Sequence, residues 1–473
     1  MKRKCNSPSR MLVLLLTVLM ILLTACETAN SSKESDTQPT GTDASEQTES
    51  TSVTTEAPSF TGTWSDYKIT FTPDEWPTGE SGLNTTQFLN IAVNLIQLME
   101  DRFDSAPQQF GIFTADAENK TPRIHLSYDA SLTEREYRVV VTEDSIPDIL
   151  LSASSTNGLF GAISYLCEEC LPWDGSLPEP CSFSSAVVYW ADPCVMLYDG
   201  VYYMPQGTGS GYSVAKSTDL YTWSEQKVVF DASTCTNPAF DGIGDYWAPE
   251  LHEYQGKFYI FATYRSAESD HRGAAIFRSD TPDGEYELIS DGHLQPEGWD
   301  SIDPTLYVDP DGNPWMVFVH EWTSMEDGIG DMTAVRLSED LTETVGEFYP
   351  LFKANACREC PGNNVTDGPW IYEMSDGKLA MVWSGTGKGY TTCVAYSENG
   401  ILGPWEQADE LFFADDTERP QGFFGHGAGH AMLFRDQNGD LRMSLHILPT
   451  ASYSNRMPFF LHIDDSDGVL RVR

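Results

Sequence analysis

The stretch Ser301–Trp322, SIDPTLYVDPDGNPWMVFVHEW, carries the pattern that decides the fold. An Asp-Pro pair beginning at Asp303 leads into an apolar run, the turn-forming residues DPDGN follow at 309–313, and a second apolar run ends in aromatic residues. Two apolar runs joined by such a turn predict a β-hairpin. The carboxylate of Asp303 stands at the start of this hairpin.

Four more segments of the chain repeat this plan at intervals of roughly 55 to 65 residues, which is typical of a repeat architecture. A further strand pair follows each hairpin, for example GYSVAKSTDLYTWSE at residues 211–225. Four strands in each of five repeats predict a mainly β fold, a five-bladed β-propeller over residues 181–473. The four other hairpins begin at residues 191–193, 246–250, 366–369 and 429–430, and their turns lie at 199–200, 255–256, 376–377 and 438–439.

Three of the five hairpins begin with an aspartate, namely Asp192, Asp303 and Asp367. The innermost strand of a blade lines the central channel of a propeller, so the five strand starts place their side chains around one funnel. Because these aspartates stand before the first strand and not in its turn, we expect their carboxylates to face one cavity. Other aspartates lie inside the hairpin turns and have the ordinary role of turn formers. They are Asp199, Asp309, Asp311 and Asp376.

The charge of the chain restricts its partners. The 473 residues include 71 Asp and Glu against 28 Lys and Arg, a formal net charge of −43. This balance argues against nucleic acid as a partner, because phosphate backbones attract basic surfaces. An acidic surface suits a soluble body that handles neutral ligands, and it also serves solubility alone.

The N-terminus has the pattern of a targeting segment, residues 1–25. A basic stretch at residues 2–4 precedes an apolar run at 11–23 that is short for a membrane span. The segment resembles a bacterial lipoprotein signal, which implies cleavage before Cys26 and a lipid on that cysteine; an ordinary secretory signal peptide is the alternative. Residues 26–59, rich in Ser, Thr and acidic residues, predict a disordered tether. We therefore expect a protein outside the cytoplasm, held at the surface of a bacterial membrane by its lipid alone.

Eight cysteines follow the tether, an even number in a compartment that permits disulfides. Two CxxC pairs suggest zinc, but neither has a second pair at the spacing of a zinc ribbon. Buried thiols or local disulfides are the preferred interpretation. The cysteines are Cys167, Cys170, Cys181, Cys194, Cys235, Cys357, Cys360 and Cys393.

Residues 60–180 have a different pattern from the repeats. Apolar residues at helical spacing predict helices over 87–102 and 158–169, and strand patterns occupy 123–129 and 137–155. This composition predicts a small α+β layer. It resembles the accessory domain that precedes the catalytic domain of several glycosidases, where a phrase like GLFGA at residues 158–162 follows a strand pair. We assign no catalytic residue to it.

The ordered set of hairpin openings resembles glycoside hydrolase family 43, whose members are five-bladed propellers. The resemblance implies inverting hydrolysis of α-L-arabinofuranosyl or β-D-xylosyl linkages in neutral plant-type polysaccharides or oligosaccharides. It also implies that Asp192 is the general base, that Asp303 adjusts the pKa of the acid and positions it, and that Asp367 is the general acid. The phrases that carry the resemblance are DP at 192–193, WAPE at 247–250, SID at 301–303, DGPW at 367–370 and GHAM at 429–432.

One position departs from the family pattern. The family places a glutamate before Gly-Pro, whereas this chain has Asp367, which is one methylene shorter. A displacement of about 1 Å can cost about a hundredfold in rate. Either the backbone compensates, which we favour, or Glu250 or Glu373 is the acid. The remaining hypothesis is a catalytically silent surface lipoprotein that binds polysaccharide.

Further candidate residues lie beside the openings. Family resemblance implies that His430 binds a calcium ion or an ordered water near the propeller axis, although no cofactor is required for inverting hydrolysis. Trp247 and Trp370 are candidate substrate-binding residues, because the C–H face of a sugar packs on an aromatic ring. Glu250 and His430 are the other candidates for substrate binding. Arg265 and His271 are expected at the rim of the pocket.

A sialidase-like propeller is the other enzyme class that the sequence suggests. Residues 217–223, STDLYTW, resemble an Asp-box but lack the glycine after the aspartate and occur once. A sialidase also needs an arginine cluster for the substrate carboxylate, which a chain this acidic supplies poorly. The segment is therefore interpreted as a turn at a blade corner.

Overall fold

The computed structural model describes residues 62–72, 76–77, 83–107, 109–112, 121–413, 426–448 and 455–473. The predicted signal peptide, Cys26 and the predicted tether lie outside these residues. Among the described helices, none combines the length and the apolar character that a membrane crossing requires. Residues from Phe60 onward form one compact unit.

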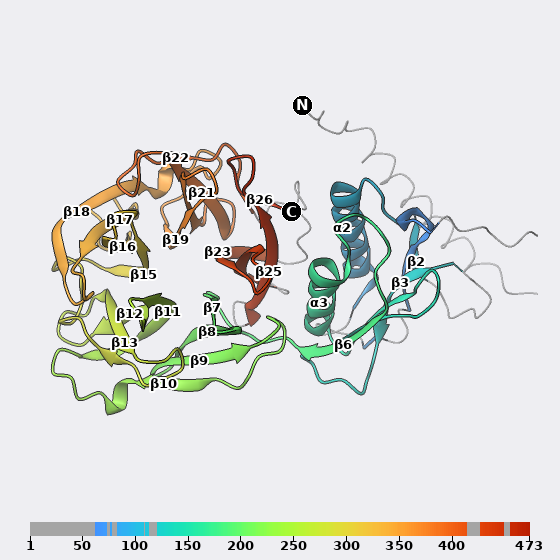
Figure 1. The fold of residues 1–473 in the computed structure, drawn as a ribbon, viewed down its shortest axis with the longest axis horizontal. Coiled ribbons are helices and arrows are strands. Elements are labelled where there is room, and N and C mark those ends of the chain that lie inside the picture. The colour runs from blue at the N-terminus through green and yellow to red at the C-terminus, as the bar shows by residue number, and fades with distance from the viewer. Residues whose placement is uncertain are drawn as a thin grey trace, which may run out of the picture. The chain divides into compact units, whose positions relative to one another are not determined.

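The first part of this unit is a six-stranded sheet with the strand order β2-β1-β3-β5-β4-β6. Strands β2, β1, β3 and β5 are parallel, while β4 runs antiparallel to both of its neighbours. The predicted α+β pattern is present here (Figure 1). The strands are β1 (Lys68–Phe71), β2 (Gln109–Ile112), β3 (Arg123–Tyr128), β4 (Glu136–Val141), β5 (Ile149–Ala153) and β6 (Cys181–Ala186).

Two α-helices belong to this sheet, α2 (Thr85–Phe103) and α3 (Thr156–Tyr165). Asn84 caps α2 by accepting a hydrogen bond of 2.9 Å from the backbone N–H of Gln87, whose side chain accepts one from Asn84 in return. Helix α3 packs tightly on the sheet, since a Cβ at Gly158 would lie 2.6 Å from the carbonyl oxygen of Glu136. The GLFGA phrase therefore reflects close helix–sheet packing.

The sheet includes one strand beyond the predicted end of this domain. We placed the boundary at residue 180, but β6 pairs with β4 over its full length. The change from the α+β sheet to the propeller thus comes after Ala186. Periodicity within a strand does not show which sheet the strand joins.

The remainder of the described chain contains five four-stranded antiparallel sheets, each built from consecutive strands, so the predicted five-bladed propeller is confirmed (Figure 1). The middle strands are buried on both faces, which explains continuous apolar runs such as WMVFV at 315–319. The blades consist of β7 (Met196–Tyr198), β8 (Val201–Thr208), β9 (Gly211–Ser217) and β10 (Lys227–Asp231); β11 (Gly242–Tyr254), β12 (Lys257–Ser266), β13 (Arg272–Ser279) and β14 (Glu287–Leu288); β15 (Ser301–Val308), β16 (Pro314–His320), β17 (Asp331–Leu337) and β18 (Thr344–Lys353); β19 (Asp367–Glu373), β20 (Leu379–Gly385), β21 (Thr391–Ser397) and β22 (Glu406–Gln407); and β23 (His426–Arg435), β24 (Leu441–Leu448), β25 (Met457–Asp464) and β26 (Arg471–Val472).

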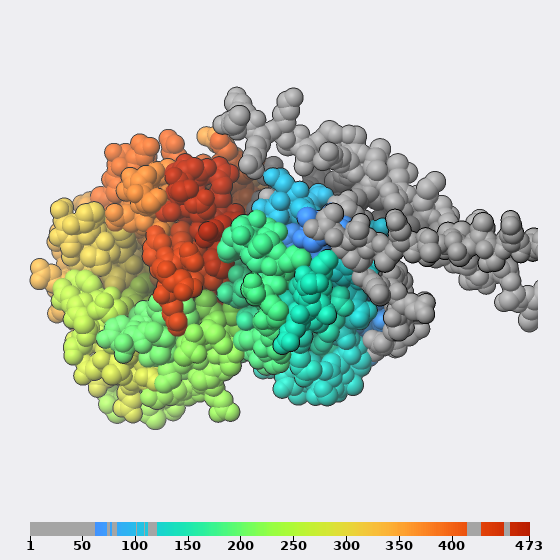
Figure 2. Space-filling view, turned by 45° about the vertical axis from the view of Figure 1, so that its right-hand side comes forward, coloured from blue at the N-terminus to red at the C-terminus, as the bar shows by residue number. Residues whose placement is uncertain are grey.

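The first and fifth blades meet and close the ring. The hydroxyl of Ser444 donates a hydrogen bond to the carbonyl of Pro193, and the N–H of Gln437 donates one to the hydroxyl of Tyr202. In the space-filling view the first blade (green) lies against the fifth (red) (Figure 2). Closure holds the five inner strands around one axis.

A buried polar cluster joins the fifth blade to the residues that follow α3. Arg442 is 2% exposed, and its guanidinium donates hydrogen bonds to Glu169 at 2.9 Å and to Asp436 at 3.3 Å. Glu168, also buried, accepts from the backbone N–H of His462 at 3.1 Å. Burial of these charges is offset by their mutual pairing.

We expect Arg442→Met to lower the free energy of unfolding by about 3 kcal/mol, because it leaves buried Asp436 without its cation. Urea denaturation measures this change. Arg471→Met is the control, since the Arg471–Asp467 pair is exposed and its loss should cost less than about 1 kcal/mol. Equal losses in the two variants would contradict the assignment of a buried ionic cluster.

Candidate active site

The first strand of blades two to five contains at least one residue with left-handed backbone geometry, and in the first blade such a residue, Asp192, lies four residues before β7. Left-handed geometry is strained for residues other than glycine and is maintained only where the surrounding structure requires it. In four of the five blades a proline follows directly, and a register shift interrupts the pairing of the first strand in blades two to five. Such shifts bend a strand and redirect its side chains. The left-handed residues are Asp192 (φ 51°), Ala248 (φ 38°), Asp303 (φ 54°), Gly368 (φ 49°) and His430 (φ 51°).

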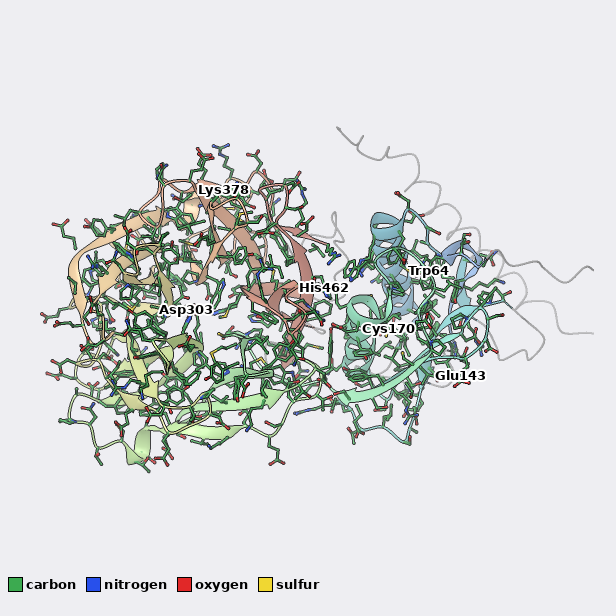
Figure 3. All side chains as sticks on the ribbon, viewed as in Figure 1. Trp64, Glu143, Cys170, Asp303, Lys378 and His462 are labelled. Carbon is green, nitrogen blue, oxygen red and sulfur yellow. The ribbon has the colours of Figure 1, made fainter. Side chains whose placement is uncertain are left out.

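The structure brings the three predicted aspartates together around His430. Nδ1 of His430 lies 3.4 Å from Oδ1 of Asp192 and 3.3 Å from Oδ1 of Asp367. One donor atom each of Asp303, Asp367 and His430 fall within 4.8 Å of one another. Figure 3 shows Asp303 where the blades of the propeller converge.

His430 is the positive centre of this group. Its side chain is 2% exposed, and its backbone N–H donates a hydrogen bond of 2.8 Å to the hydroxyl of Ser384. Burial alone would lower the pKa of the imidazole, but the charges of the three aspartates outweigh it and raise the pKa to about 10. The ring is thus an imidazolium at neutral pH and offsets part of the negative charge around it.

Asp192 is an ionised carboxylate. Burial opposes its charge, but the two neighbouring histidines and Arg456 outweigh burial and hold the pKa of Asp192 well below its usual range. His446 Nδ1 lies 3.1 Å from the same oxygen, Oδ1, and Arg456 lies 3.5 Å from it. A carboxylate that stays ionised is able to accept a proton from water.

Asp303 and Asp367 form a coupled pair. Burial and the charge of Asp367 raise the pKa of Asp303 well above its usual value, while the backbone N–H of Gly368 donates a hydrogen bond to Asp303 Oδ2 at 3.0 Å. Burial also opposes ionisation of Asp367, but hydrogen bonds from Asp303 and His430 lower its pKa. Two carboxyl groups this close share one proton, and they titrate as a coupled pair and not as separate residues.

The three aspartates differ in their exposure to solvent. The side chains of Asp192 and Asp367 are 18% and 22% exposed, whereas Asp303 is 3% exposed. Only the first two are therefore accessible to a ligand in the funnel. One oxygen of each lies near Nδ1 of His430, at 3.4 and 3.3 Å. These two oxygens are therefore no farther apart than the sum of the two distances.

Three residues of the site were missed by the sequence analysis. Tyr390 donates a hydrogen bond of 2.9 Å from its hydroxyl to Asp367 Oδ2, and its ring stacks on His446 at 5.3 Å between centroids. Arg456 and His446 contact Asp192, as described above. None of the three lies near a hairpin opening in the sequence, so no local pattern indicates their role.

Two of the predicted substrate-binding residues, Glu250 and Trp370, contact the same histidine, His252. Glu250 is fully buried, and its Oε2 lies 2.9 Å from Nε2 of His252. Trp370 stacks on the ring of His252 at 5.5 Å. Burial raises the pKa of Glu250. One face of Trp370 is thus occupied by a protein side chain, and its role in binding sugar stays a prediction.

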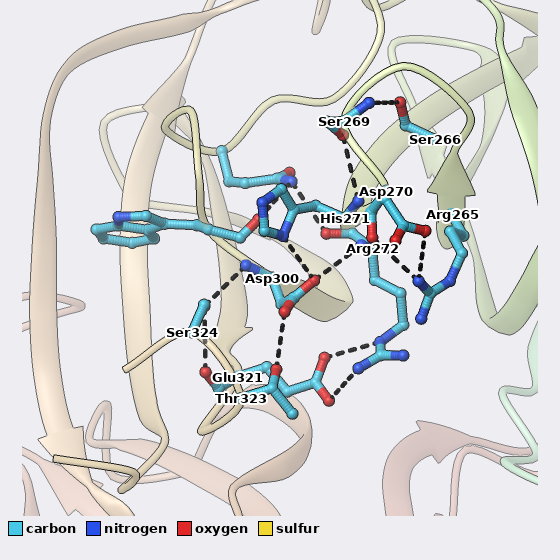
Figure 4. Close-up of polar contacts among 12 residues, drawn as sticks. Arg265, Ser266, Ser269, Asp270, His271, Arg272, Asp300, Glu321, Thr323 and Ser324 are labelled. Atoms are coloured by element: carbon cyan, nitrogen blue, oxygen red, sulfur yellow. Dashed lines mark hydrogen bonds and ion pairs between the residues drawn. The ribbon is translucent and has the colours of Figure 1, made fainter. Parts of the chain in front are cut away.

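Trp247, by contrast, is 45% exposed at the edge of the funnel. The guanidinium of Arg272 lies 5.2 Å from the centre of its ring. Arg272 donates two hydrogen bonds to Glu321, of 2.8 and 2.6 Å (Figure 4). Burial and the charges of Asp300 and Asp367 raise the pKa of Glu321.

The predicted rim residues belong to the same network. Arg265 donates hydrogen bonds to Asp245 at 3.0 Å and to Asp270 at 2.9 Å. His271 Nδ1 lies 3.1 Å from Asp300, as Figure 4 shows. Asp245 also lies 3.4 Å from Arg272. The network connects the loops of blades two and three, and so orders the surface around Trp247.

Nε2 of His430 fits an ordered water. It is buried and has no hydrogen-bond partner among the described residues, and buried polar atoms normally have a partner. Because an imidazolium has no lone pair to offer a cation and calcium takes oxygen ligands, this nitrogen does not suit direct calcium binding. The calcium site at His430 stays a prediction.

Comparison with known proteins identifies the family of the propeller. The family model of glycosyl hydrolases family 43 matches residues 186–469. The chain is 29% identical over 176 residues to the extracellular endo-α-(1→5)-L-arabinanase 1 of Bacillus subtilis (strain 168), a match that covers 34% of this chain and 50% of that protein. This chain spans about half the length of the curated relatives it matches.

Two solved structures from Bacteroides thetaiotaomicron VPI-5482 also match. An endo-arabinase is 35% identical, with a TM-score of 0.52, over 59% of this chain and 96% of that chain. An endo-1,4-β-xylanase is 26% identical, with a TM-score of 0.50, over 61% of this chain and 95% of that chain. The shared region is the propeller, which contains the group around His430.

The contact of Gly368 with His430 gives a test of this packing. A Cβ at Gly368 would lie 2.9 Å from the imidazole, so Gly368→Ala should displace His430 and lower the melting temperature. Gly377→Ala is the matched control: it has the same left-handed strain (φ 83°) in the same blade, but its Cβ would meet nothing within 4 Å. Differential scanning fluorimetry measures both. The packing is contradicted if Gly368→Ala is no less stable than the control.

Proposed function

The chain belongs to glycosyl hydrolases family 43, and we propose that it hydrolyses α-L-arabinofuranosyl linkages of an arabinan-type polysaccharide with inversion. Family membership makes it a glycosidase, and its relatives are named as hydrolases of arabinan or xylan. The observation that carries the proposal is the pair of accessible carboxylates, Asp192 and Asp367, on either side of His430, with the buried Asp303 against one of them.

Asp192 has the properties of the general base. Inversion requires an ionised carboxylate that activates water on the face of the sugar opposite the leaving group. His430, His446 and Arg456 keep Asp192 ionised, and its partial exposure lets a water reach it. The shared contact with His430 keeps the nearest oxygens of the pair at or below the lower end of the range of about 6.5 to 9.5 Å found for inverting pairs, so the proposal of inversion rests on the family and not on this distance.

Asp367 has the position of the general acid. The proton of the Asp303–Asp367 pair rests on the buried Asp303 and passes to Asp367 when the glycosidic oxygen arrives, because only Asp367 is accessible from the funnel. The leaving alcohol takes that proton, and the water activated by Asp192 forms the new C–O bond. The hydroxyl of Tyr390 fixes the shorter aspartate side chain, which supports compensation for the missing methylene.

Arabinan is preferred over xylan on the identity of the matched proteins. The endo-arabinase is 35% identical to this chain, and the xylanase is 26% identical. A β-D-xylosyl substrate is the second candidate, supported by that xylanase structure. A silent binding protein has no support among these relatives.

The proposed place of action is the outer surface of a bacterial membrane. The lipoprotein-like signal with Cys26 and the tether to residue 59 support this location, and the Bacillus subtilis relative is named as extracellular. A calcium ion beside His430 would supply positive charge near the axis. No chemical step of the proposal passes through it.

We expect Asp192→Asn and Asp367→Asn each to reduce turnover on linear arabinan by at least about a hundredfold, since each removes one partner of the acid–base pair. Release of reducing sugar measures this, with arabinoxylan, xylan and the nitrophenyl arabinofuranoside and xyloside tested in parallel. Asp311→Asn, in the hairpin turn of the third blade, is the control and should retain full activity. Turnover on xylan alone would select the second candidate, and full activity in either test variant would refute the assignment.

Asp303→Asn should move the alkaline limb of the pH–rate profile to lower pH, by about one unit or more. When the Asp303–Asp367 pair loses its shared proton, both side chains are negatively charged. The charge of Asp303 therefore raises the pKa of the pair, and the neutral amide in the Asp303→Asn variant lacks this charge. The acid limb should stay in place, because Asp192 is held ionised by other residues. An alkaline limb that does not move, or moves upward, would show that Asp303 does not set the pKa of the acid.

A further inference from the structure

Three cysteines from distant parts of the sequence meet inside the fourth blade. Cys357 and Cys360 follow a short 3-10 helix (Ala354–Ala356) in the connection from β18 to β19, and Cys393 lies in the middle of β21. Their exposed fractions are 6%, 0% and 2%. The three sulfur atoms all lie within 4.8 Å of one another, and Sγ of Cys357 is 3.9 Å from Sγ of Cys393.

This spacing matches ligands of a common metal ion. Two thiolates at about 2.3 Å from a tetrahedral zinc are separated by about 3.8 Å. A disulfide requires about 2.05 Å between sulfurs and would unite two of the three, leaving the third as a buried thiol. A metal ion that prefers sulfur ligands would bind all three sulfur atoms at once.

A neighbouring hydroxyl has a similar spacing. Oγ1 of Thr391, which is fully buried, lies 3.8 Å from Sγ of Cys360 and 3.9 Å from Sγ of Cys393. Lys388, in the connection from β20 to β21, pairs with Glu359 at 3.7 Å, between the two cysteines of the CxxC motif. A zinc ion with three thiolates has a net charge of −1, and the Lys388–Glu359 pair adds no net charge beside it.

We propose that Cys357, Cys360 and Cys393 bind one Zn²⁺ ion, with Thr391 or a water molecule as the fourth ligand. Each thiol releases its proton on binding, so the site takes up the metal with loss of three protons. The three cysteines are buried, as the ligands of structural zinc are, and the fourth position differs from that of common structural sites in having no Cys or His. This zinc site does not depend on the proposed glycosidase activity.

The proposed zinc ties the connection before β19 to the interior of its own blade. Asp367 starts β19 seven residues after Cys360, and Asn363 between them accepts a hydrogen bond of 3.0 Å from the backbone N–H of Thr386. A Cβ at Gly387 would lie 2.7 Å from Cβ of Cys360, so the β20–β21 connection packs directly on this segment. The metal would therefore stabilise the backbone that leads to Asp367.

The test begins with the metal content of the full chain, purified under reducing conditions without chelators. Elemental analysis should find one zinc per chain. Replacement by Co²⁺ should produce the visible d–d bands of a tetrahedral site and a thiolate-to-metal charge-transfer band. Titration of accessible thiols in urea, before and after removal of the metal, should show three thiols released.

Cys393→Ser and Cys357→Ser should each lose the metal and melt at a lower temperature. Cys181→Ser is the matched control, because Cys181 also has a thiol 3.9 Å away, that of Cys170, but no third cysteine, and it should retain the zinc. If a serine variant does not fold, the zinc content and cobalt spectrum of the unmodified chain decide the question. Absence of zinc together with no cobalt–thiolate band, or a mass lower by two hydrogens that shows a disulfide among the three, would overturn the proposal.

Discussion

The structure depends on the charge balance around His430. Three carboxylates converge within a few ångströms in a poorly hydrated funnel, where their mutual repulsion would oppose folding. One buried imidazolium among them offsets part of that repulsion and gives the carboxylates different protonation states. Asp192, close to His446 and Arg456 as well, is ionised, whereas Asp303, with no comparable cation in contact, keeps a proton.

Strained backbone produces this convergence. A left-handed residue lies in or shortly before the first strand of each blade, and five such positions hold Asp192, Ala248, Asp303, Gly368 and His430. Ala248 and Gly368 are small, and the second of them must be, because His430 lies against it. In the fourth blade the carboxylate near His430 is therefore that of Asp367, one residue before the equivalent position.

The fourth blade also contains most of what holds Asp367 in place. Tyr390 donates a hydrogen bond to the carboxylate of Asp367, and the backbone N–H of Gly368 donates one to Asp303. Two of the three clustered cysteines lie in the connection that leads to Asp367. Aspartate is one methylene shorter than the glutamate of the family pattern, so the backbone of the strand itself must compensate by bringing the carboxylate into position. A rigid fourth blade is a physical means of such compensation.

Local pattern determined much of this protein. The hairpin repeat, the turns and the alternation of apolar residues predict five blades and an α+β domain, because each of these features is set by neighbours in sequence. Asp192, Asp303, Asp367 and His430 could be selected because they begin the repeats. Tertiary structure alone decided the rest: that β6 joins the first sheet, that Tyr390, His446 and Arg456 reach the aspartates, and that Cys393 completes a cluster with Cys357 and Cys360. These contacts join strands far apart in the chain, and their geometry follows from how blades pack around a closed ring, which no local spacing of residues encodes.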